Sequence, residues 1–131
     1  MNAFIATIAY FVISTIVIYI GLLIFEMVTT KYKDYEEIKN GNIAVALSIA
    51  GKAIGISIIL AFSIYHSAHI YDTVIWGAVG IVLQMVGYVL VEFFTRRFSV
   101  EEQLKNNNIA VGIFSMSISI ALGLVVGASI T

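Results

Sequence analysis

The sequence predicts an all-α integral membrane protein in which four transmembrane helices form two parallel, same-orientation tandem two-helix repeats. Three observations predict this fold. Of the 131 residues, 60% are hydrophobic and only 11% are charged, whereas soluble domains carry roughly 25% charged residues. The hydrophobic residues are concentrated in four long runs, and most basic residues lie in two loops of similar sequence. The whole chain, residues 1–131, is therefore expected to be a single transmembrane domain.

Four runs are long enough to cross a bilayer, because a hydrocarbon core of about 30 Å requires about 20 apolar residues of α-helix. The expected spans are Phe4–Val28, Ile43–Ile64, Thr73–Phe94 and Ile109–Ile130. Strands are disfavoured, since an open sheet leaves backbone groups unpaired in lipid and a barrel needs more, shorter segments. The first run has no basic leader and no small-residue cleavage site, so we expect a retained helix rather than a secretory signal.

The basic residues predict the orientation, because Lys and Arg near span ends are held on the cytoplasmic side. The loop after span one contains Lys31, Lys33 and Lys39, and the loop after span three contains Arg96, Arg97 and Lys105. The remaining basic residue, Lys52, lies inside span two. Both basic loops are therefore expected to be cytoplasmic, with both termini and the turn at residues 65–72 on the periplasmic or extracellular side.

The two basic loops are related by an internal duplication. Residues 26–47 and 92–113 align at a constant shift of 66 without a gap, and nine of the 22 positions are identical. Repeat one is expected to cover about residues 1–65 and repeat two about residues 72–131. Since each copy contains two spans, both copies begin on the same side of the membrane, unlike the inverted repeats of many transporters.

Each basic loop is expected to contain a short helix at the membrane surface. In the second loop Ser99 precedes Glu102 at the spacing of a capping box, in which the two side chains satisfy the first N–H groups of a helix. In the first loop Asp34 precedes Glu37 at the same spacing, so Asp34 is expected to be the N-cap.

Asparagine and threonine residues of the duplicated segment are expected to have capping roles. Asn42 and Asn108 directly precede spans two and four, where their side chains would cap the two helices. Thr29 and Thr95 end spans one and three, and we expect them to bond back to their own helices or to the neighbouring carboxylates.

The duplicated hairpin resembles the bacterial membrane family catalogued as domain of unknown function 350. The resemblance covers essentially the whole chain and is carried by Glu26, Thr29, Gly41-Asn42-Ile43-Ala44-Val45-Ala46 and Ala50-Gly51-Lys52, with their counterparts in the second half. The second half departs from the pattern, because Asn107 replaces the glycine and Ser117-Ile118 stands where Gly51-Lys52 would be. The resemblance implies a multi-pass protein of the bacterial inner membrane, and it implies no established activity.

Lys52 is the main candidate for a functional residue. An ammonium near the bilayer centre costs at least about 2.5 kcal/mol unless it is paired or hydrated. Glu26 and Glu92, each at the cytoplasmic end of an odd-numbered span, are the available partners. Such a pair could fix the register of the helices or take part in the passage of ions or protons, and the sequence leaves both readings open. Gln84, in span three, is expected to cross-link helices.

Small residues predict where helices approach closely. Gly51 and Gly55 lie in span two, and Gly123 and Gly127 lie in span four. Spans two and four are therefore expected either to form the central pair or to provide the contact between subunits. Spans one and three carry more bulky side chains, as lipid-facing helices do.

The outer turn contains His66, His69 and Asp72, which are weak candidates for metal ligands because exposed histidines in one turn are common. We expect no metal and no cofactor. The chain has no cysteine, and no span has a central histidine that could hold haem.

The sequence favours a function other than catalysis. It contains no recognisable nucleophile and base, no phosphate-binding glycine loop and no metal cluster. The net charge of -1 disfavours nucleic acid as a partner.

We expect a homo-oligomeric assembly in the lipid bilayer that serves as an ion or small-solute conduit lined by Lys52, Glu26 and Glu92. An oligomer is expected because four helices packed as one bundle leave no lumen. The alternative is a membrane scaffold or stress-response component whose cytoplasmic loops dock a partner protein.

Overall fold

The computed structural model describes residues 2–29, 32–66, 68–94 and 99–130, and within these ranges it contains only helices. The helices are α1 (Ala3–Val28), α2 (Asp34–Lys39), α3 (Ile43–His66), α4 (Ile70–Phe94), α5 (Val100–Lys105) and α6 (Ile109–Ser129). Four of them, α1, α3, α4 and α6, are long and apolar enough to cross a membrane, which confirms the predicted spans. The largest difference in bounds is at α4, which begins at Ile70 rather than Thr73.

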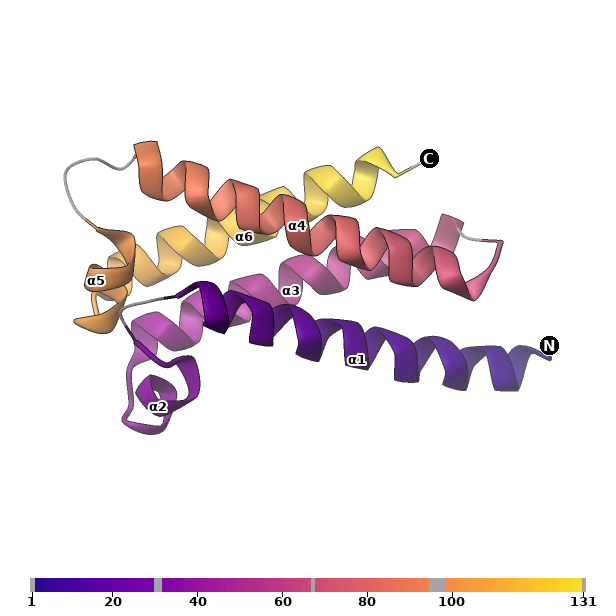
Figure 1. Ribbon diagram of the computed structural model, residues 1–131, viewed down its shortest axis with the longest axis horizontal. Coiled ribbons are helices and arrows are strands. Elements are labelled where there is room, and N and C mark those ends of the chain that lie inside the picture. Colours follow the sequence, from indigo (N-terminus) through magenta and orange to yellow (C-terminus); the bar gives the residue numbers. More distant parts are fainter. Residues whose placement is uncertain (1, 30–31, 67, 95–98, 131) are drawn as a thin grey trace.

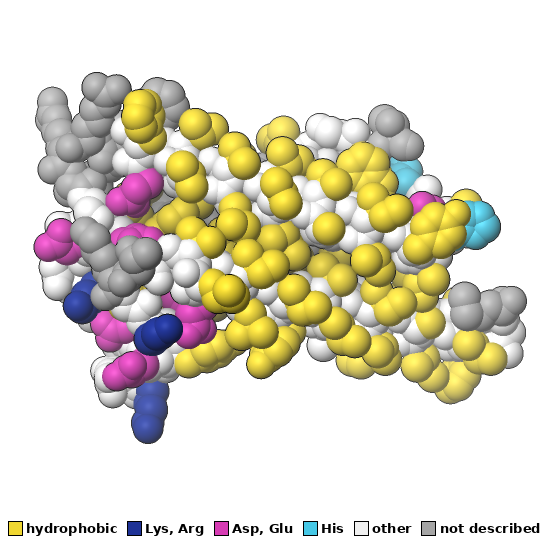
Figure 2. All heavy atoms as spheres, in the orientation of Figure 1, with side chains coloured by type: hydrophobic (Ala, Val, Ile, Leu, Met, Phe, Trp, Pro, Cys, Tyr) yellow, Lys and Arg dark blue, Asp and Glu magenta, His cyan; other side chains and the backbone are white. Residues whose placement is uncertain are grey.

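The four long helices run along one axis, with both short helices at one end of the molecule (Figure 1). We call this the loop end. The α3–α4 turn and the ends of α1 and α6 that lead to the chain termini lie at the opposite end (Figure 1). Figure 2 shows that acidic and basic side chains gather at the loop end, whereas hydrophobic side chains cover the middle of the molecule. An apolar belt between polar ends is the surface expected of a protein solvated by lipid tails.

Helix α3 is the centre of the bundle. Half of the residues in its most apolar stretch are buried, against 22% in α4 and α6 and 17% in α1. Its most extensive contact is with α6. At their crossing, a β-carbon added to Gly123 would lie 2.6 Å from the Cα of Gly55, so only glycine permits this approach.

The other glycines singled out in the sequence also lie at close contacts between α3 and α6. Gly51 of α3 lies against the backbone of Met116 in α6, and Gly127 of α6 lies against the Phe62 ring of α3. The faces that we expected either to pair within the protomer or to join subunits are thus occupied within a single chain.

Asn42 ties the two halves of the loop end together. Its Oδ1 accepts from the Val45 N–H at 3.0 Å and so caps α3. Its Nδ2 donates to the carbonyl oxygens of Leu104 at 2.9 Å and Lys105 at 3.0 Å, at the end of α5. Across the same junction, the Asn107 side chain accepts from the Ala44 N–H at 3.0 Å. The start of α3 is therefore held against the end of α5, which is more than 60 positions away in sequence.

Two residues at the ends of the short helices adopt left-handed backbone conformations. Gly41 has a φ of 85° and Asn107 a φ of 59°, and they are equivalent positions at the shift of 66. Glycine and asparagine are the residues that most readily adopt this conformation after a helix. The replacement of the family's glycine by Asn107 therefore preserves the backbone path.

The capping residues follow the sequence prediction except at Asp34. Ser99 caps α5 by accepting from the Glu102 N–H, Asn108 caps α6 by accepting from the Val111 N–H, and Thr29 donates to the Phe25 carbonyl at 2.9 Å. The prediction that Asp34 is an N-cap was wrong. Lys33 is the N-cap of α2, without a side-chain bond, because the Asp34 carboxyl is buried in the protein instead. Thr95 lies outside the described residues.

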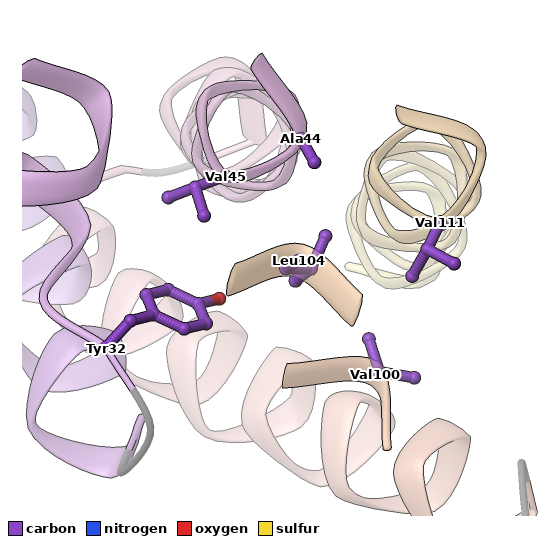
Figure 3. Packing of buried hydrophobic residues seen from close by; sticks show 6 residues of the cluster. All are labelled: Tyr32, Ala44, Val45, Val100, Leu104 and Val111. Atoms are coloured by element: carbon purple, nitrogen blue, oxygen red, sulfur yellow. The ribbon is translucent and has the colours of Figure 1, made fainter. Parts of the chain in front are cut away.

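A hydrophobic cluster closes the loop end. It consists of Tyr32, Ala44, Val45, Val100, Leu104 and Val111. These side chains come from the segment before α2 and from α3, α5 and α6, and Figure 3 shows the Tyr32 hydroxyl pointing toward α5. The cluster holds both short helices against the bundle, so the side chains beneath it are screened from bulk water.

Candidate functional site

Lys52 is buried in the bundle without a hydrogen bond. Its side chain is 1% exposed, and its Nζ has no hydrogen-bond partner in the described part of the chain. The Nζ lies 4.9 Å from the centroid of the Phe25 ring in α1 and 5.0 Å from that of the Tyr88 ring in α4. Two aromatic faces therefore stabilise the ammonium in place of carboxylate oxygens.

The expected hydrogen-bonded pair between Lys52 and Glu26 or Glu92 does not form among the described residues. Glu92 instead accepts from the Ser99 hydroxyl at 3.1 Å and from the Val100 N–H at 3.2 Å through its Oε1. These bonds satisfy the start of α5 and draw that oxygen away from the lysine. Glu26 is partly exposed at the end of α1 and acts through space on Asp34.

Two other carboxylates, which the sequence analysis did not single out for this role, act on Lys52. Asp34, at the start of α2, is 2% exposed, and Glu101 is in the first turn of α5. Both interact electrostatically with the lysine. We call Lys52, Asp34, Glu92, Glu101, Tyr32 and Tyr88 the Lys52 cluster.

The duplication held a signal that could have found Asp34. At the shift of 66, Asp34 aligns with Val100 and Lys52 aligns with Ile118. Val100 is itself buried in the hydrophobic cluster, and its counterpart at the equivalent position faces inward as well. The first half thus carries an acid and a base at two positions where the second half carries aliphatic residues.

The Lys52 cluster contains an unusual concentration of unsatisfied polar atoms. Among the described residues, five buried atoms of the cluster have no hydrogen-bond partner, namely Lys52 Nζ, Asp34 Oδ1, Glu92 Oε2, Tyr32 Oη and Tyr88 Oη. The Glu101 carboxylate interacts with the Tyr88 hydroxyl. Buried polar atoms in proteins are nearly always paired with protein groups or water. A group of five therefore marks a place where water or a small ion is expected.

The electrostatics of the cluster favour the neutral forms of Asp34 and Tyr32. Burial raises the pKa of Asp34 above the ordinary 3.8, the Lys52 charge opposes that rise, and Glu26 and Glu101 reinforce it. Burial also raises the pKa of the Tyr32 hydroxyl, and the carboxylates of Asp34 and Glu101 add to the effect. Asp34 therefore keeps its proton at a higher pH than a solvated aspartate does.

A polar pocket opens next to the cluster at the loop end. Its volume is about 280 Å³, and it is lined by Tyr32, Lys33, Glu36, Glu37 and Lys105. Tyr32 lines this pocket and also interacts with Asp34, Glu92 and Glu101 of the Lys52 cluster. We call this pocket the mouth.

Other polar groups inside the bundle form hydrogen bonds between helices. The Gln84 amide of α4 donates to the Ser119 carbonyl of α6 at 3.1 Å, which is the cross-link expected of it. Ser48 of α3 and Ser115 of α6 share a hydrogen bond of 3.1 Å. The Gln84 amide and the hydroxyls of Ser48 and Ser115 therefore have a structural role, because they connect neighbouring helices.

The residues of the outer turn make local contacts. The His66 ring stacks on Phe62 at 6.5 Å, and the His69 ring stacks on Tyr71 at 5.2 Å. The Asp72 carboxylate accepts from the His69 N–H at 3.3 Å. Within the described ranges, no three His, Asp or Glu side chains are grouped in a way that could hold a metal ion.

Comparison with known proteins places the chain among membrane proteins without an assigned activity. The family model described as Domain of Unknown Function (DUF350) matches residues 1–130. The chain is similar to the UPF0719 transmembrane protein YshE of Bacillus subtilis (strain 168), with 36% identity over 129 residues, covering 98% of this chain and 96% of the relative. It is also similar to the UPF0719 inner membrane protein YjfL of Escherichia coli (strain K12), with 28% identity over 131 residues, covering 100% and 97%. No solved structure matches the chain.

Proposed function

Because this chain belongs to the DUF350 family and is a multi-pass membrane protein, we propose that copies of it assemble in the bilayer into a homo-oligomer that conducts a small ion. The Lys52 cluster would be the site where that ion is bound or its passage is controlled. The proposal rests above all on one observation, which is that a buried lysine and a buried aspartate interact without a hydrogen bond on Lys52 Nζ or Asp34 Oδ1 in the described part of the chain.

Such a cluster is costly for a purely structural role. Charged groups within a membrane protein are stabilised by pairing or hydration, and they commonly mark ion pathways. A structural salt bridge would satisfy its polar atoms by direct hydrogen bonds. Lys52 Nζ and Asp34 Oδ1 make none, so an exchangeable water or ion is the better account of their arrangement.

An oligomer is required because the protomer has no central lumen in its described part. The backbones of α3 and α6 touch at Gly55 and Gly123, which closes the middle of the bundle. The small-residue faces of α3 and α6 already contact each other inside the protomer. Contacts between subunits must therefore use other surfaces. An apolar groove of about 290 Å³ between α1 and α4, which includes Val17, Ile24 and Met85, is a suitable contact.

This contact would bring the Lys52 cluster close to the subunit boundary. The lysine Nζ is held between Phe25 of α1 and Tyr88 of α4, the two helices that border the groove. Ile24 of the groove directly precedes Phe25 in sequence, and Met85 lies three positions before Tyr88, on the same side of α4. A path formed between subunits along α1 and α4 would therefore pass beside the buried charges.

We assign the loop end to the cytoplasm. In this orientation the two halves of the chain are repeats that cross the membrane in the same direction. Lys33, Lys39 and Lys105 lie at this end, and basic residues are retained inside the cell. Lys31, Arg96 and Arg97 fall outside the described residues. The Escherichia coli relative is named an inner membrane protein, which supports the inner membrane as the location of this chain.

Reconstituted flux tests the conduit. Purified protein in proteoliposomes should carry ions down an imposed gradient, and Lys52→Met should change that flux several-fold because it removes the buried charge. Lys39→Met is the matched control, since Lys39 is an exposed lysine of α2 and its loss should leave the flux unaltered. A strictly monomeric protein in nanodiscs, or wild-type vesicles that pass no ion under any gradient, would refute the proposal.

A scaffold remains the second candidate, and the mouth favours it. Acidic and basic side chains from α2 and α5 line this surface pocket together, as in a site that docks a charged peptide. A cytoplasmic pull-down that is lost on Glu36→Ala and Lys105→Ala, while ion flux is absent, would select the scaffold over the conduit.

A further inference from the structure

We propose that Asp34 is the proton-binding group of the Lys52 cluster and that the ion passed by the assembly is the proton. Proton binding by Asp34 is inferred from its own surroundings, whereas proton passage rests on the conduit function proposed above.

The surroundings of Asp34 suit a neutral carboxyl better than a carboxylate. The residue is 2% exposed, and its Oδ1 is buried and accepts no hydrogen bond from the residues that the structure describes. A buried carboxylate is stabilised when several N–H or O–H groups donate to it. Lys52, which attracts its negative charge, is directed between two aromatic rings. Taking up a proton removes the buried negative charge without any movement of the helices.

Acidic groups face Asp34 from most of the elements around it. Glu26 of α1 and Glu101 of α5 repel its negative charge, and Lys52 of α3 attracts it. Glu92 of α4 acts on the adjoining Tyr32, and α6 contributes no charged side chain. With all groups ionised, one lysine would be opposed by several carboxylates, so adding one proton moves the cluster toward neutrality.

Two other ligand classes fit this cluster less well. A metal cation needs several oxygen or nitrogen ligands around one point, and no such group of three acids or histidines occurs in the described ranges. The Lys52 ammonium would also repel it. A small anion would meet more carboxylates than basic groups among the described residues of the cluster. The proton is the ion that a lone, poorly solvated carboxyl binds.

The mouth provides the exchange route. Tyr32 lines it, and the Tyr32 hydroxyl is buried without a hydrogen-bond partner next to the cluster. A proton arriving from water forms an O–H bond on an Asp34 oxygen, which leaves the carboxyl neutral. Release breaks that bond and returns the proton to water or to the next acceptor. Neither step needs another reactant.

Infrared difference spectroscopy tests proton binding directly. Wild-type protein in nanodiscs should show the C=O band of a protonated carboxyl that disappears on raising the pH, with a midpoint above that of a solvated aspartate, about 3.9. Asp34→Asn should abolish this band. Asp72→Asn is the matched control, because it alters an aspartate at the opposite end of the molecule and should preserve the band.

The charged neighbours sharpen the test. Lys52→Met removes the attraction that favours the carboxylate, so the midpoint should rise by about one pH unit or more. Glu101→Gln removes a repulsion and should lower the midpoint. If Asp34→Asn does not fold, these two shifts in opposite directions still identify the titrating group.

The outcomes separate the two proposals. A band that persists in folded Asp34→Asn, or a midpoint unmoved by Lys52→Met, overturns proton binding by Asp34. An Asp34 band without flux of any ion in proteoliposomes leaves the binding site standing and refutes the conduit. Flux of sodium or potassium ions that is independent of pH and of Asp34 supports the conduit and refutes the proton as its ion.

Discussion

At the scale of single residues, Asn42 and Lys52 illustrate two different uses of a buried polar side chain. Asn42 satisfies three backbone groups and joins the start of α3 to the end of α5. Lys52 satisfies none and rests between aromatic rings. A fully bonded side chain contributes stability, whereas an unbonded charge reduces it and is available for chemistry.

Removal of the Asn42 side chain should therefore be strongly destabilising. Asn42→Ala deletes the cap of α3 and leaves two α5 carbonyl oxygens without their donor, so we expect a loss of about 1–3 kcal/mol. Thermal unfolding in detergent measures it. Asn40→Ala is the control, because Asn40 is exposed and the bonds that it makes at the end of α2 come from its backbone N–H, which alanine keeps. Equal melting temperatures for the two variants would contradict this role.

At the scale of elements, the contact between α3 and α6 determines how the bundle closes. Glycines on both helices let the two backbones touch, and a close backbone approach replaces the hydrophobic driving force that lipid removes. The short helices α2 and α5 then cover the loop-end side of this pair. Their positions set the distance between Asp34, Glu101 and Lys52, so the site depends on the packing of elements rather than on one helix.

The glycine contact predicts a difference between two alanine substitutions. In Gly123→Ala the new β-carbon would meet the Gly55 backbone, which cannot move aside, whereas in Gly87→Ala it would meet the end of the flexible Leu122 side chain. We expect Gly123→Ala to cost about 1–3 kcal/mol of stability and Gly87→Ala to cost clearly less. Chemical denaturation in mixed micelles would compare them, and the reverse order would contradict the rigid crossing.

At the scale of the whole molecule, the apolar belt and the charged loop end define how the protein sits in a bilayer. Both short helices are at the loop end, opposite the α3–α4 turn (Figure 1). Since the mouth opens at the same end, protons or other ligands of the Lys52 cluster would enter from the compartment that this end faces. The orientation therefore determines which compartment the site can sense.

Cysteine labelling tests the orientation cleanly, because the natural chain has no cysteine. Single variants Asn2→Cys and Ser129→Cys should react with a membrane-impermeant maleimide added outside intact cells. Lys39→Cys should react only after the membrane is opened, because basic loops stay inside. Labelling of the two end positions from opposite compartments would contradict an even number of spans with repeats of one orientation.

The sequence by itself determined the class of fold, the four spans and the short helix in each loop. Long apolar runs and local capping are properties of neighbouring residues, so they can be read along the chain. It also predicted that Lys52 was exceptional, because a charge inside an apolar run has a known cost.

Only the tertiary structure decided what surrounds Lys52. Glu92 is drawn to the start of α5 by the Ser99 hydroxyl and the Val100 N–H, and Asp34 is turned inward by the packing of α2 against the bundle. Such contacts join segments that are distant in sequence, and their geometry depends on how closely α3 and α6 approach. Residue spacing carries no information about that distance, which is why the acids acting on Lys52 were found only in the folded chain.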